Sequence, residues 1–460
     1  MTGLLRTKTI NADHHLVDTG LRRVLGPVDL TLLGVGAIIG AGIFVLTGVA
    51  AATYAGPAIV LSYVVAGFAC AFAALAYAEL AAAIGGCGSA YGYSYAGLGE
   101  LVAWIIGWDL ILEYSVAVSA VAIGWSAYMN NALQAMGLAL PAGLLKGPLE
   151  GGLINLPAAA IVLILGLLLT LGVRQSARFN AAMVLIKLLA IGVFIAIAVS
   201  HVNPANWSPF MPFGWSGVMG GAALIFFAYV GFDAVSTAAE EARNPQRDLP
   251  IGILVSLAVC TLIYILVAGL LTGVVPYATL NVGSPVADVV LRLGYPWGAG
   301  LVAAGAIAGL TTVMLVLYYG LTRVFLAIAR DGLLPPLFAR VNPRTQTPIR
   351  VIAASGLLMA AIAGLTPIGD VAELVNIGTL AAFFLVSVGV LVLRYTHPDL
   401  PRPFRTPFSP LIPLLGAASC LYLMASLPLV TWLRFGVWLA LGLLIYFTYS
   451  RRHSTLAGGV

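Results

Sequence analysis

Residues 34–48 read GVGAIIGAGIFVLTG, which places five glycines in fifteen residues of an otherwise apolar segment. A glycine inside a helix costs about 1 kcal/mol relative to alanine. Close helix packing explains part of the pattern, because small residues four apart, such as Gly36 and Gly40, let two helices touch. Residues two apart face different sides of a helix, so packing alone does not explain Gly40 and Gly42. We therefore predict that a helix is locally unwound here.

The whole chain has the composition of an integral membrane protein. It has 460 residues, of which 61% are hydrophobic and 8% are charged, whereas soluble domains carry about 25% charged residues. A mean hydropathy of +1.03 leaves too little polar surface to cover a soluble core. Only helices or closed barrels satisfy the backbone in hydrocarbon. Continuous apolar runs such as 251–275 favour helices, because barrel strands alternate polar and apolar residues. We predict an all-α integral membrane protein.

The apolar runs predict twelve transmembrane helices. They span approximately residues 28–53, 58–84, 98–127, 156–173, 179–200, 217–239, 251–275, 298–329, 349–365, 371–394, 411–430 and 435–450. The third and the eighth are long enough to require tilt or an extension beyond the bilayer. The segments between the runs have the length of connections, so we expect a single transmembrane domain over residues 1–460.

Basic residues predict the orientation of the chain. If the N-terminus is cytoplasmic, only Lys146, Arg292 and Arg434 of the 22 Lys and Arg residues lie outside, and Lys187 lies within a span. Such a bias favours cytoplasmic tails at both ends, residues 1–27 and 451–460. We expect a multi-pass protein of the inner or plasma membrane. The spread of these basic residues over short loops argues against a nucleic-acid partner.

An unwound helix has a chemical use. It exposes N–H groups, which attract a carboxylate, and carbonyl groups, which accept hydrogen bonds from an ammonium group. A small zwitterion such as an amino acid matches both. Residues 226–233 contain a second candidate break, with Gly231 beside Asp233. Paired interruptions in two halves of a chain point to the binding site of a transporter.

Five ionisable residues fall within apolar runs: Glu79, Asp109, Glu113, Lys187 and Asp233. Charged groups at this depth are costly and often mark a pathway or a relay. Glu79 lies near a span end, where snorkelling or capping is the simpler interpretation. Asp109 and Glu113 share one helix face because they are four residues apart. Lys187 could relay protons or form a permanent salt bridge with a carboxylate such as Glu113, and Asp233 could cap the N–H groups of the second break.

Several other functions find no support in the sequence. The five histidines fall in predicted loops or tails, which argues against an intramembrane histidine relay or metal site. The chain has no Walker motif, so transport driven by ATP is not expected. Of the cysteines, Cys70, Cys260 and Cys420 lie in apolar runs, which favours packing over disulfides. We expect no cofactor, no metal and no enzymatic activity.

Four stretches resemble a known family. Residues 34–48 are similar to the first-helix signature of the amino acid–polyamine–organocation transporters. Residues 88–100 (GSAYGYSYAGLGE), 227–253 (FAYVGFDAVSTAAEEARNPQRDLPIGI) and 322–348, which include RDGLLP, resemble the cationic amino acid transporter branch of that superfamily. The resemblance covers residues 21–405 and is strongest to bacterial, proton-coupled members.

The resemblance implies a LeuT-type fold, with a five-plus-five inverted repeat over residues 28–200 and 217–394 and two additional helices over 411–450. It implies uptake of L-amino acids with protons as the coupling ion, by alternating access. Lys187 would occupy the place where sodium-coupled relatives hold an ion, would bridge the first and eighth helices, and would have Glu113 nearby. Leu317 would line the side-chain pocket. The substrate's carboxylate and amine would be held through the backbone of Ile38, Ile39, Gly40, Ala41, Gly42 and Ile43. The site would be completed by Phe227, Ala228, Val230 and Gly231.

Leu317 departs from what a strongly cationic substrate favours, because it is bulky and apolar. Small neutral amino acids, similar to alanine, are therefore favoured, with cationic amino acids as a further possibility. An amino acid exchanger or a sodium symporter on the same fold is the alternative, since Thr311 and Thr312 offer hydroxyl oxygens to sodium. A membrane-embedded enzyme or a channel is less compatible with the sequence, which shows neither a nucleophile–base pair nor repeated polar rings.

Overall fold

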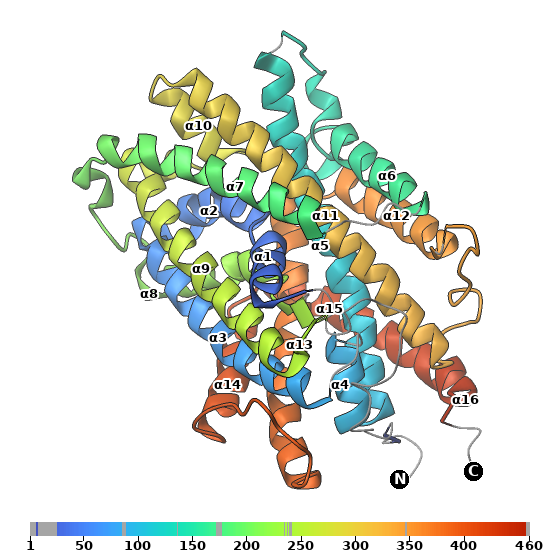
Figure 1. The fold of residues 1–460 in the computed structure, drawn as a ribbon. Helices are drawn as coiled ribbons and strands as arrows, with labels where there is room; N and C mark the ends of the chain where they lie inside the picture. Colours follow the sequence, from blue (N-terminus) through green and yellow to red (C-terminus); the bar gives the residue numbers. More distant parts are fainter. Residues whose placement is uncertain are drawn as a thin grey trace.

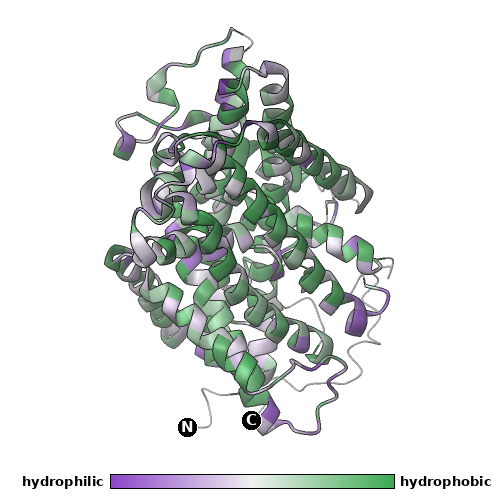
Figure 2. Cartoon of the chain, turned by 90° about the vertical axis from the view of Figure 1, so that its left-hand side faces the viewer, coloured by the Kyte–Doolittle hydropathy of each residue, from purple (hydrophilic) through white to green (hydrophobic). Residues whose placement is uncertain are grey.

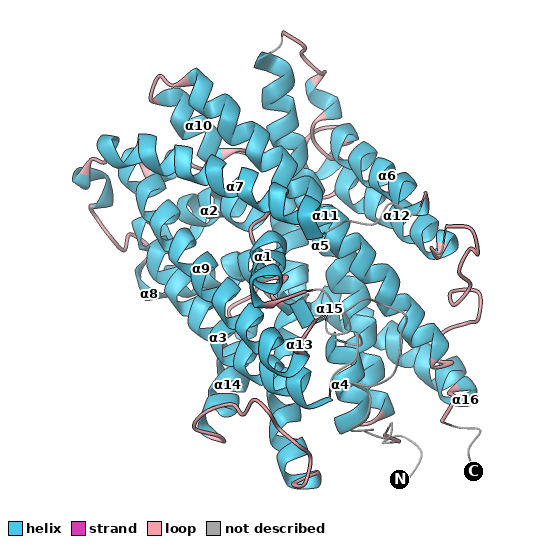
Figure 3. Ribbon diagram, viewed as in Figure 1, coloured by secondary structure: helices cyan, strands magenta, loops and turns pink. Residues whose placement is uncertain are grey.

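The computed structural model describes residues 6–7, 25–84, 89–135, 137–171, 177–233, 235–236, 238, 242–345 and 347–456. Within these ranges the secondary structure is helical, and residues pair in the manner of a sheet only at two isolated bridges (Figure 3). The predicted all-α class is confirmed. Cys87 and most of the predicted N-terminal tail lie outside the described residues.

The main helices follow one another along the whole chain (Figure 1). They are α1 (Pro27–Ile38), α3 (Ile59–Ile84), α4 (Ser89–Gly97), α5 (Glu100–Ala135), α6 (Leu156–Thr170), α7 (Ala177–Ala198), α8 (Gly214–Ile225), α9 (Pro245–Val274), α10 (Pro285–Arg292), α11 (Pro296–Arg330), α12 (Ile349–Leu365), α13 (Ile368–Thr396), α14 (Leu411–Ala425) and α15 (Leu429–Ile445). Short helical turns join them: η2 (Gly42–Leu46), α2 (Thr47–Ala50), η3 (Ala51–Ala55) and η4 (Gly56–Ala58) between α1 and α3, η9 (Phe226–Tyr229) after α8, and η12 (Tyr446–Ser450) after α15.

The apolar helices make this a multi-pass membrane protein. In the described part of the chain, seven helices are long and apolar enough to cross a bilayer, and five further apolar helices are shorter. Figure 2 shows hydrophobic residues along the helices and hydrophilic residues gathered at helix ends and loops. Each of the twelve predicted runs overlaps one or more of these helices. The count of twelve membrane crossings stays a prediction, because length and composition alone support seven.

Two helices are much longer than a bilayer requires. α5 has 36 residues and α11 has 35, which corresponds to about 50 Å each. Because the hydrocarbon core is about 30 Å thick, both must tilt or extend beyond it. They also pack against each other. The prediction that the third and eighth apolar runs are the long ones is confirmed.

The short helix α1 occupies a central position. It packs against α7, α9 and α11, which surround it in Figure 1. Its last turns, from Gly34 to Ile38, are buried. Irregular backbone is tolerated in a membrane where it faces protein, so the buried end of this helix can be interrupted. The fold therefore puts the glycine-rich stretch where a break is sustainable.

The two described ends of the chain meet at one buried carboxylate. Glu100, the first residue of α5, accepts hydrogen bonds from Tyr446 Oη at 3.0 Å and from Ser454 Oγ at 2.5 Å. Its backbone N–H donates to Arg6 O at 2.9 Å. Both ends therefore lie on the same side of the helix bundle, as the even number of predicted spans requires.

Two predicted helix ends differ clearly from the structure. The third run is predicted to end at residue 127, but α5 continues to Ala135. The eleventh run is predicted to continue to residue 430, but α14 ends at Ala425 and α15 begins at Leu429. Pro428 lies between them and has no N–H to continue the first helix. Hydropathy alone does not register this stop. The helices α4 and α10, which lie outside the predicted runs, were also missed.

Glu79 has a structural role, although not the predicted snorkelling or capping at a span end, because it forms a buried ion pair with Arg394. Its carboxylate is buried and accepts hydrogen bonds from Arg394 Nη2 and from the Thr406 backbone N–H, both at 2.7 Å. Arg402 Nε lies 3.6 Å away. Glu79 thus ties α3 to the end of α13 and to the segment that leads into α14.

We expect Glu79→Ala to lower the free energy of unfolding by about 3 kcal/mol, because removing one member of a buried ion pair leaves the other charge without its partner. Asp370→Ala is the matched control, since the Asp370–Arg434 pair is 41% exposed on both sides and such pairs contribute about 0–1 kcal/mol. Thermal unfolding of both purified variants in detergent measures the difference. Equal losses of unfolding free energy in Glu79→Ala and Asp370→Ala would contradict the structural role assigned to Glu79.

Candidate functional site

The first helix is interrupted at Ile39 and Gly40. α1 ends at Ile38, and Ile39 takes an extended conformation with φ −73° and ψ 97°. Helical backbone resumes at Ala41, and Gly42 opens the π-helical turn η2. The predicted break is present, but it is narrower than the predicted span from Gly40 to Gly42. Gly42 is not needed for unwinding, because it is already helical.

Close packing accounts for Gly34 and Gly42 in this stretch. A Cβ atom on Gly42 would lie 2.3 Å from Ala228 Cα, and one on Gly34 would lie 2.4 Å from Ser256 Oγ. A Cβ atom on Gly40 would meet Val313 at an ordinary 3.5 Å. Unwinding and packing were treated as competing explanations, but both operate. Gly40 lies in the break, and Gly34 and Gly42 let neighbouring segments approach.

The second interruption follows η9. Val230 is extended, with φ −57° and ψ 130°, and Gly231 has φ +116°. A side chain at Gly231 would be strained by that φ and would bring a Cβ atom within 2.9 Å of Ala37 O. The predicted break between residues 226 and 233 is therefore present at Val230 and Gly231. The Gly42–Ala228 and Gly231–Ala37 approaches show that the two breaks face each other.

Lys187 caps the end of the first half-helix. From α7, its Nζ atom donates to Gly36 O at 2.7 Å and to Ile39 O at 3.0 Å. The side chain is fully buried. It also lies against α11, because a Cβ atom on Gly309 would be 3.2 Å from Lys187 Cε. One ammonium group thus connects the first break to α7 and α11.

Glu113 does not form an ion pair with Lys187. Among the described residues, no carboxylate pairs with Lys187, so the alternative of a permanent salt bridge is wrong. Glu113 instead interacts electrostatically with Asp109 and Asp233, and Tyr114 Oη donates to Asp233 Oδ2 at 3.1 Å. Helical rise alone could not say which neighbouring helices the side chain of Glu113 faces.

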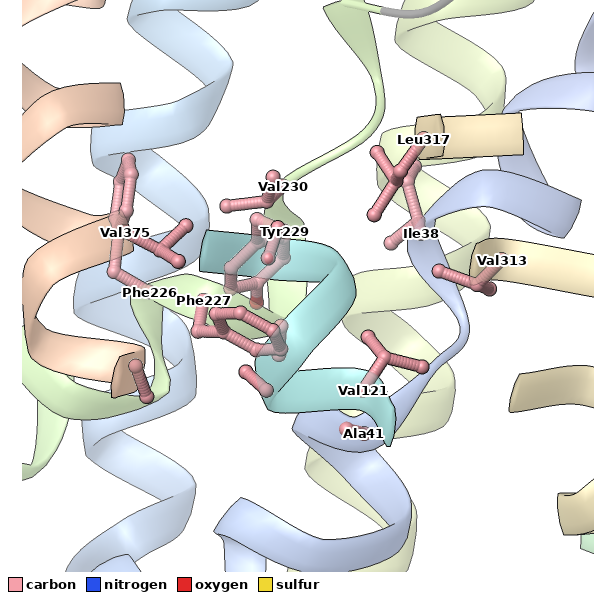
Figure 4. Packing of buried hydrophobic residues seen from close by; sticks show 14 of the residues in the cluster. Ile38, Ala41, Val121, Phe226, Phe227, Tyr229, Val230, Val313, Leu317 and Val375 are labelled. Atoms are coloured by element: carbon pink, nitrogen blue, oxygen red, sulfur yellow. The ribbon is translucent and has the colours of Figure 1, made fainter. Parts of the chain in front are cut away.

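Apolar side chains surround the two breaks. Figure 4 shows Leu317 and Val313 of α11 beside Ile38, with Phe227 and Val230 of the second break nearby. Leu317 is buried with 3% of its surface exposed, and the neighbouring positions are aliphatic or aromatic. Of the predicted backbone groups, Ile39 and Gly40 lie in the first break, Ala41, Gly42 and Ile43 open the following half-helix, and Ala228 lies in η9. The predicted substrate-binding residues are therefore brought together around the two breaks.

Sequence reasoning missed two groups near the breaks. Tyr264 of α9 reaches both of them with its hydroxyl. Val121 of α5 lies beside Ala41 in Figure 4. An aromatic or aliphatic residue within an apolar run is typical of ordinary core packing, so the sequence carries no signal that separates these two from their neighbours. Three-dimensional proximity alone identifies them.

Known proteins resemble this chain over most of its length. A family model described as amino acid permease matches residues 25–448. A methylthioribose transporter of Bacillus subtilis is 51% identical over 99% of this chain and 100% of that protein. The branched-chain amino acid permease BcaP of the same organism is 52% identical over 95% of each chain. The human cationic amino acid transporter 4 is 36% identical over 84% of this chain and 62% of that protein.

Proposed function

Because this chain belongs to the amino acid permease family of the amino acid–polyamine–organocation superfamily, we propose that it is a secondary active transporter that carries L-amino acids into the cell together with protons. Family membership supports amino acid transport. Transport by alternating access on a LeuT-type fold with twelve spans and cytoplasmic termini is part of the proposal. The transporter would be no enzyme and would need no cofactor.

The observation that carries the proposal is the pair of facing breaks. At the first, N–H groups open a helical run that begins at Ala41, where the helix dipole attracts the substrate carboxylate. At the second, the carbonyl groups at the end of η9 suit the substrate ammonium group. The two segments lie close together, since a Cβ atom on Gly42 would be 2.3 Å from Ala228 Cα. In this proposal the two charged groups of a zwitterion are bound by N–H groups of one segment and carbonyl groups of the other.

Lys187 supports coupling to protons rather than to sodium. Its ammonium group occupies the space between the first break and Gly309 of α11. The hydroxyls of Thr311 and Thr312 donate to Ile307 O and Gly309 O within their own helix. A sodium ion at this place would meet a fixed positive charge. Proton release from Lys187 would remove the positive charge that holds Gly36 O and Ile39 O, and so would weaken the cap of the break.

The apolar surroundings favour neutral substrates. Leu317, Val313 and Phe227 offer no charge to a cationic side chain. We therefore propose small neutral amino acids, similar to alanine, as the preferred substrates. Branched-chain amino acids and methylthioribose are named for two relatives, so both belong in any substrate panel, as do lysine and arginine.

Uptake into liposomes tests this function. The purified protein would be reconstituted with an inward proton gradient and offered alanine, leucine, lysine, arginine and methylthioribose, each with and without sodium and with a protonophore. We expect alanine to accumulate without sodium and to be lost with the protonophore. Uptake that requires sodium, or accumulation of none of the amino acids, would contradict the proposal.

A further inference from the structure

Tyr264 connects the two breaks through one hydroxyl group. It lies on α9, and its Oη atom donates to Ile38 O at 2.9 Å and to Ala228 O at 2.8 Å. Ile38 is the last residue of α1, and Ala228 belongs to η9. The side chain is fully buried. A group from a third helix therefore contacts the carbonyl ends of both interrupted helices at once.

The hydroxyl cannot satisfy both carbonyl groups fully. A tyrosine hydroxyl carries one hydrogen, whereas two acceptors lie within hydrogen-bond distance. At any moment one carbonyl receives the hydrogen and the other lacks that donor. A buried carbonyl without a donor is costly, so the pair of acceptors favours an additional donor beside them.

The ring of Tyr264 is held in place by its neighbours. Its centroid lies 5.3 Å from that of Tyr63 on α3 and 5.5 Å from that of Tyr229 in η9. Tyr229 Oη in turn donates to Tyr63 O at 2.9 Å. The packing of these three rings thus fixes the position of the Tyr264 hydroxyl relative to both breaks. Two neighbouring carbonyl groups at the first break, those of Gly36 and Ile39, already accept hydrogen bonds from Lys187 Nζ.

We propose that Tyr264 is a positioning residue that holds the carbonyl groups of Ile38 and Ala228 toward one point and leaves one of them for the ammonium group of the substrate. This inference rests on the proposed function and specifies how the amino end of the substrate is selected. The substrate ammonium supplies the donor that the tyrosine hydroxyl cannot supply twice. Recognition of the ammonium group then depends on Tyr264, whereas recognition of the carboxylate does not.

The test compares two ligands in two variants. Binding of L-alanine and of L-lactate, which has a hydroxyl in place of the ammonium group, would be measured for the wild type, Tyr264→Phe and Tyr318→Phe. Tyr318 is the matched control, because it is also fully buried and donates to a helix carbonyl, Ile352 O, at 2.6 Å. We expect the preference for alanine over lactate to fall about tenfold in Tyr264→Phe and to stay unchanged in Tyr318→Phe.

Other outcomes would overturn the inference. An unchanged preference in Tyr264→Phe, or an equal weakening of both ligands, would reduce Tyr264 to a packing residue. The same loss in Tyr318→Phe would show that any buried hydroxyl has this effect. If Tyr264→Phe does not fold, Tyr264→His, whose ring N–H can donate, must retain the preference, and its loss there would also overturn the inference. If the wild type binds alanine and the preference for alanine over lactate is unchanged in Tyr264→Phe, only the role of Tyr264 is refuted. If the wild type binds no amino acid, the proposed function itself is refuted.

Discussion

Lys187→Ala should reduce proton-driven accumulation of alanine to less than about a tenth of the wild-type level, since the loss of even one interaction of 1.4 kcal/mol is a tenfold effect. The wild-type ammonium group donates to Gly36 O and Ile39 O. Without it two buried carbonyls lose their donor, at about 1–3 kcal/mol each. The first break would lose both its cap and the group that exchanges a proton. Initial rates of uptake into liposomes with an imposed pH gradient measure the effect.

Lys187→Arg tests the positive charge at this position separately from the ability to release a proton. A guanidinium group keeps hydrogen-bond donors and the positive charge, but it does not release a proton in proteins. We expect this variant to bind alanine, as measured by thermal stabilisation, and to fail in proton-driven uptake. The account of coupling would be refuted by wild-type accumulation in Lys187→Ala, or by wild-type pH dependence in Lys187→Arg.

Gly42→Ala should destabilise the protein by about 3 kcal/mol, the upper end of the range for overpacking. The new Cβ atom would lie 2.3 Å from both Cα and Cβ of Ala228. Backbone cannot move aside as a flexible side chain can, so the two breaks must separate. We therefore expect loss of alanine binding in addition to the lower stability. Thermal unfolding in detergent, with and without alanine, measures both effects.

Gly40→Ala is the matched control for this prediction. It adds the same methyl group two residues away, where the nearest contact is Val313 at 3.5 Å. We expect its thermal stability to remain within about 1 kcal/mol of the wild type, because an ordinary van der Waals contact requires no shift. If Gly40→Ala and Gly42→Ala lose the same stability, the close approach of the two breaks is not what requires glycine at position 42.

The sequence located the two breaks but not their exact extent. Five glycines within one helix and the Gly231–Asp233 pair were sufficient to place them. The contribution of packing at Gly34 and Gly42 depends on Ser256 and Ala228, which are distant in the chain. No local pattern contains that information. The first break comprises only Ile39 and Gly40, which is narrower than the predicted span.

Rotation about a helix axis was the main limit on predicting the site. Periodicity and helical rise predict that Glu113 and Lys187 lie within the membrane, and both side chains are buried in the protein. They could not state which neighbouring helix each side chain faces. Lys187 faces the first break, whereas Glu113 lies with Asp109 and Asp233. Tyr264 escaped notice for a related reason, since its function depends on two carbonyls from other segments.

Proton movement during uptake is the most direct test of the central claim. Liposomes that contain the protein and a trapped pH-sensitive dye would receive L-alanine in sodium-free buffer, with no pH gradient imposed. Symport at the two breaks predicts that the lumen acidifies as alanine enters, and that Lys187→Ala shows no acidification. Entry of labelled alanine into wild-type liposomes without any change of luminal pH would contradict the account.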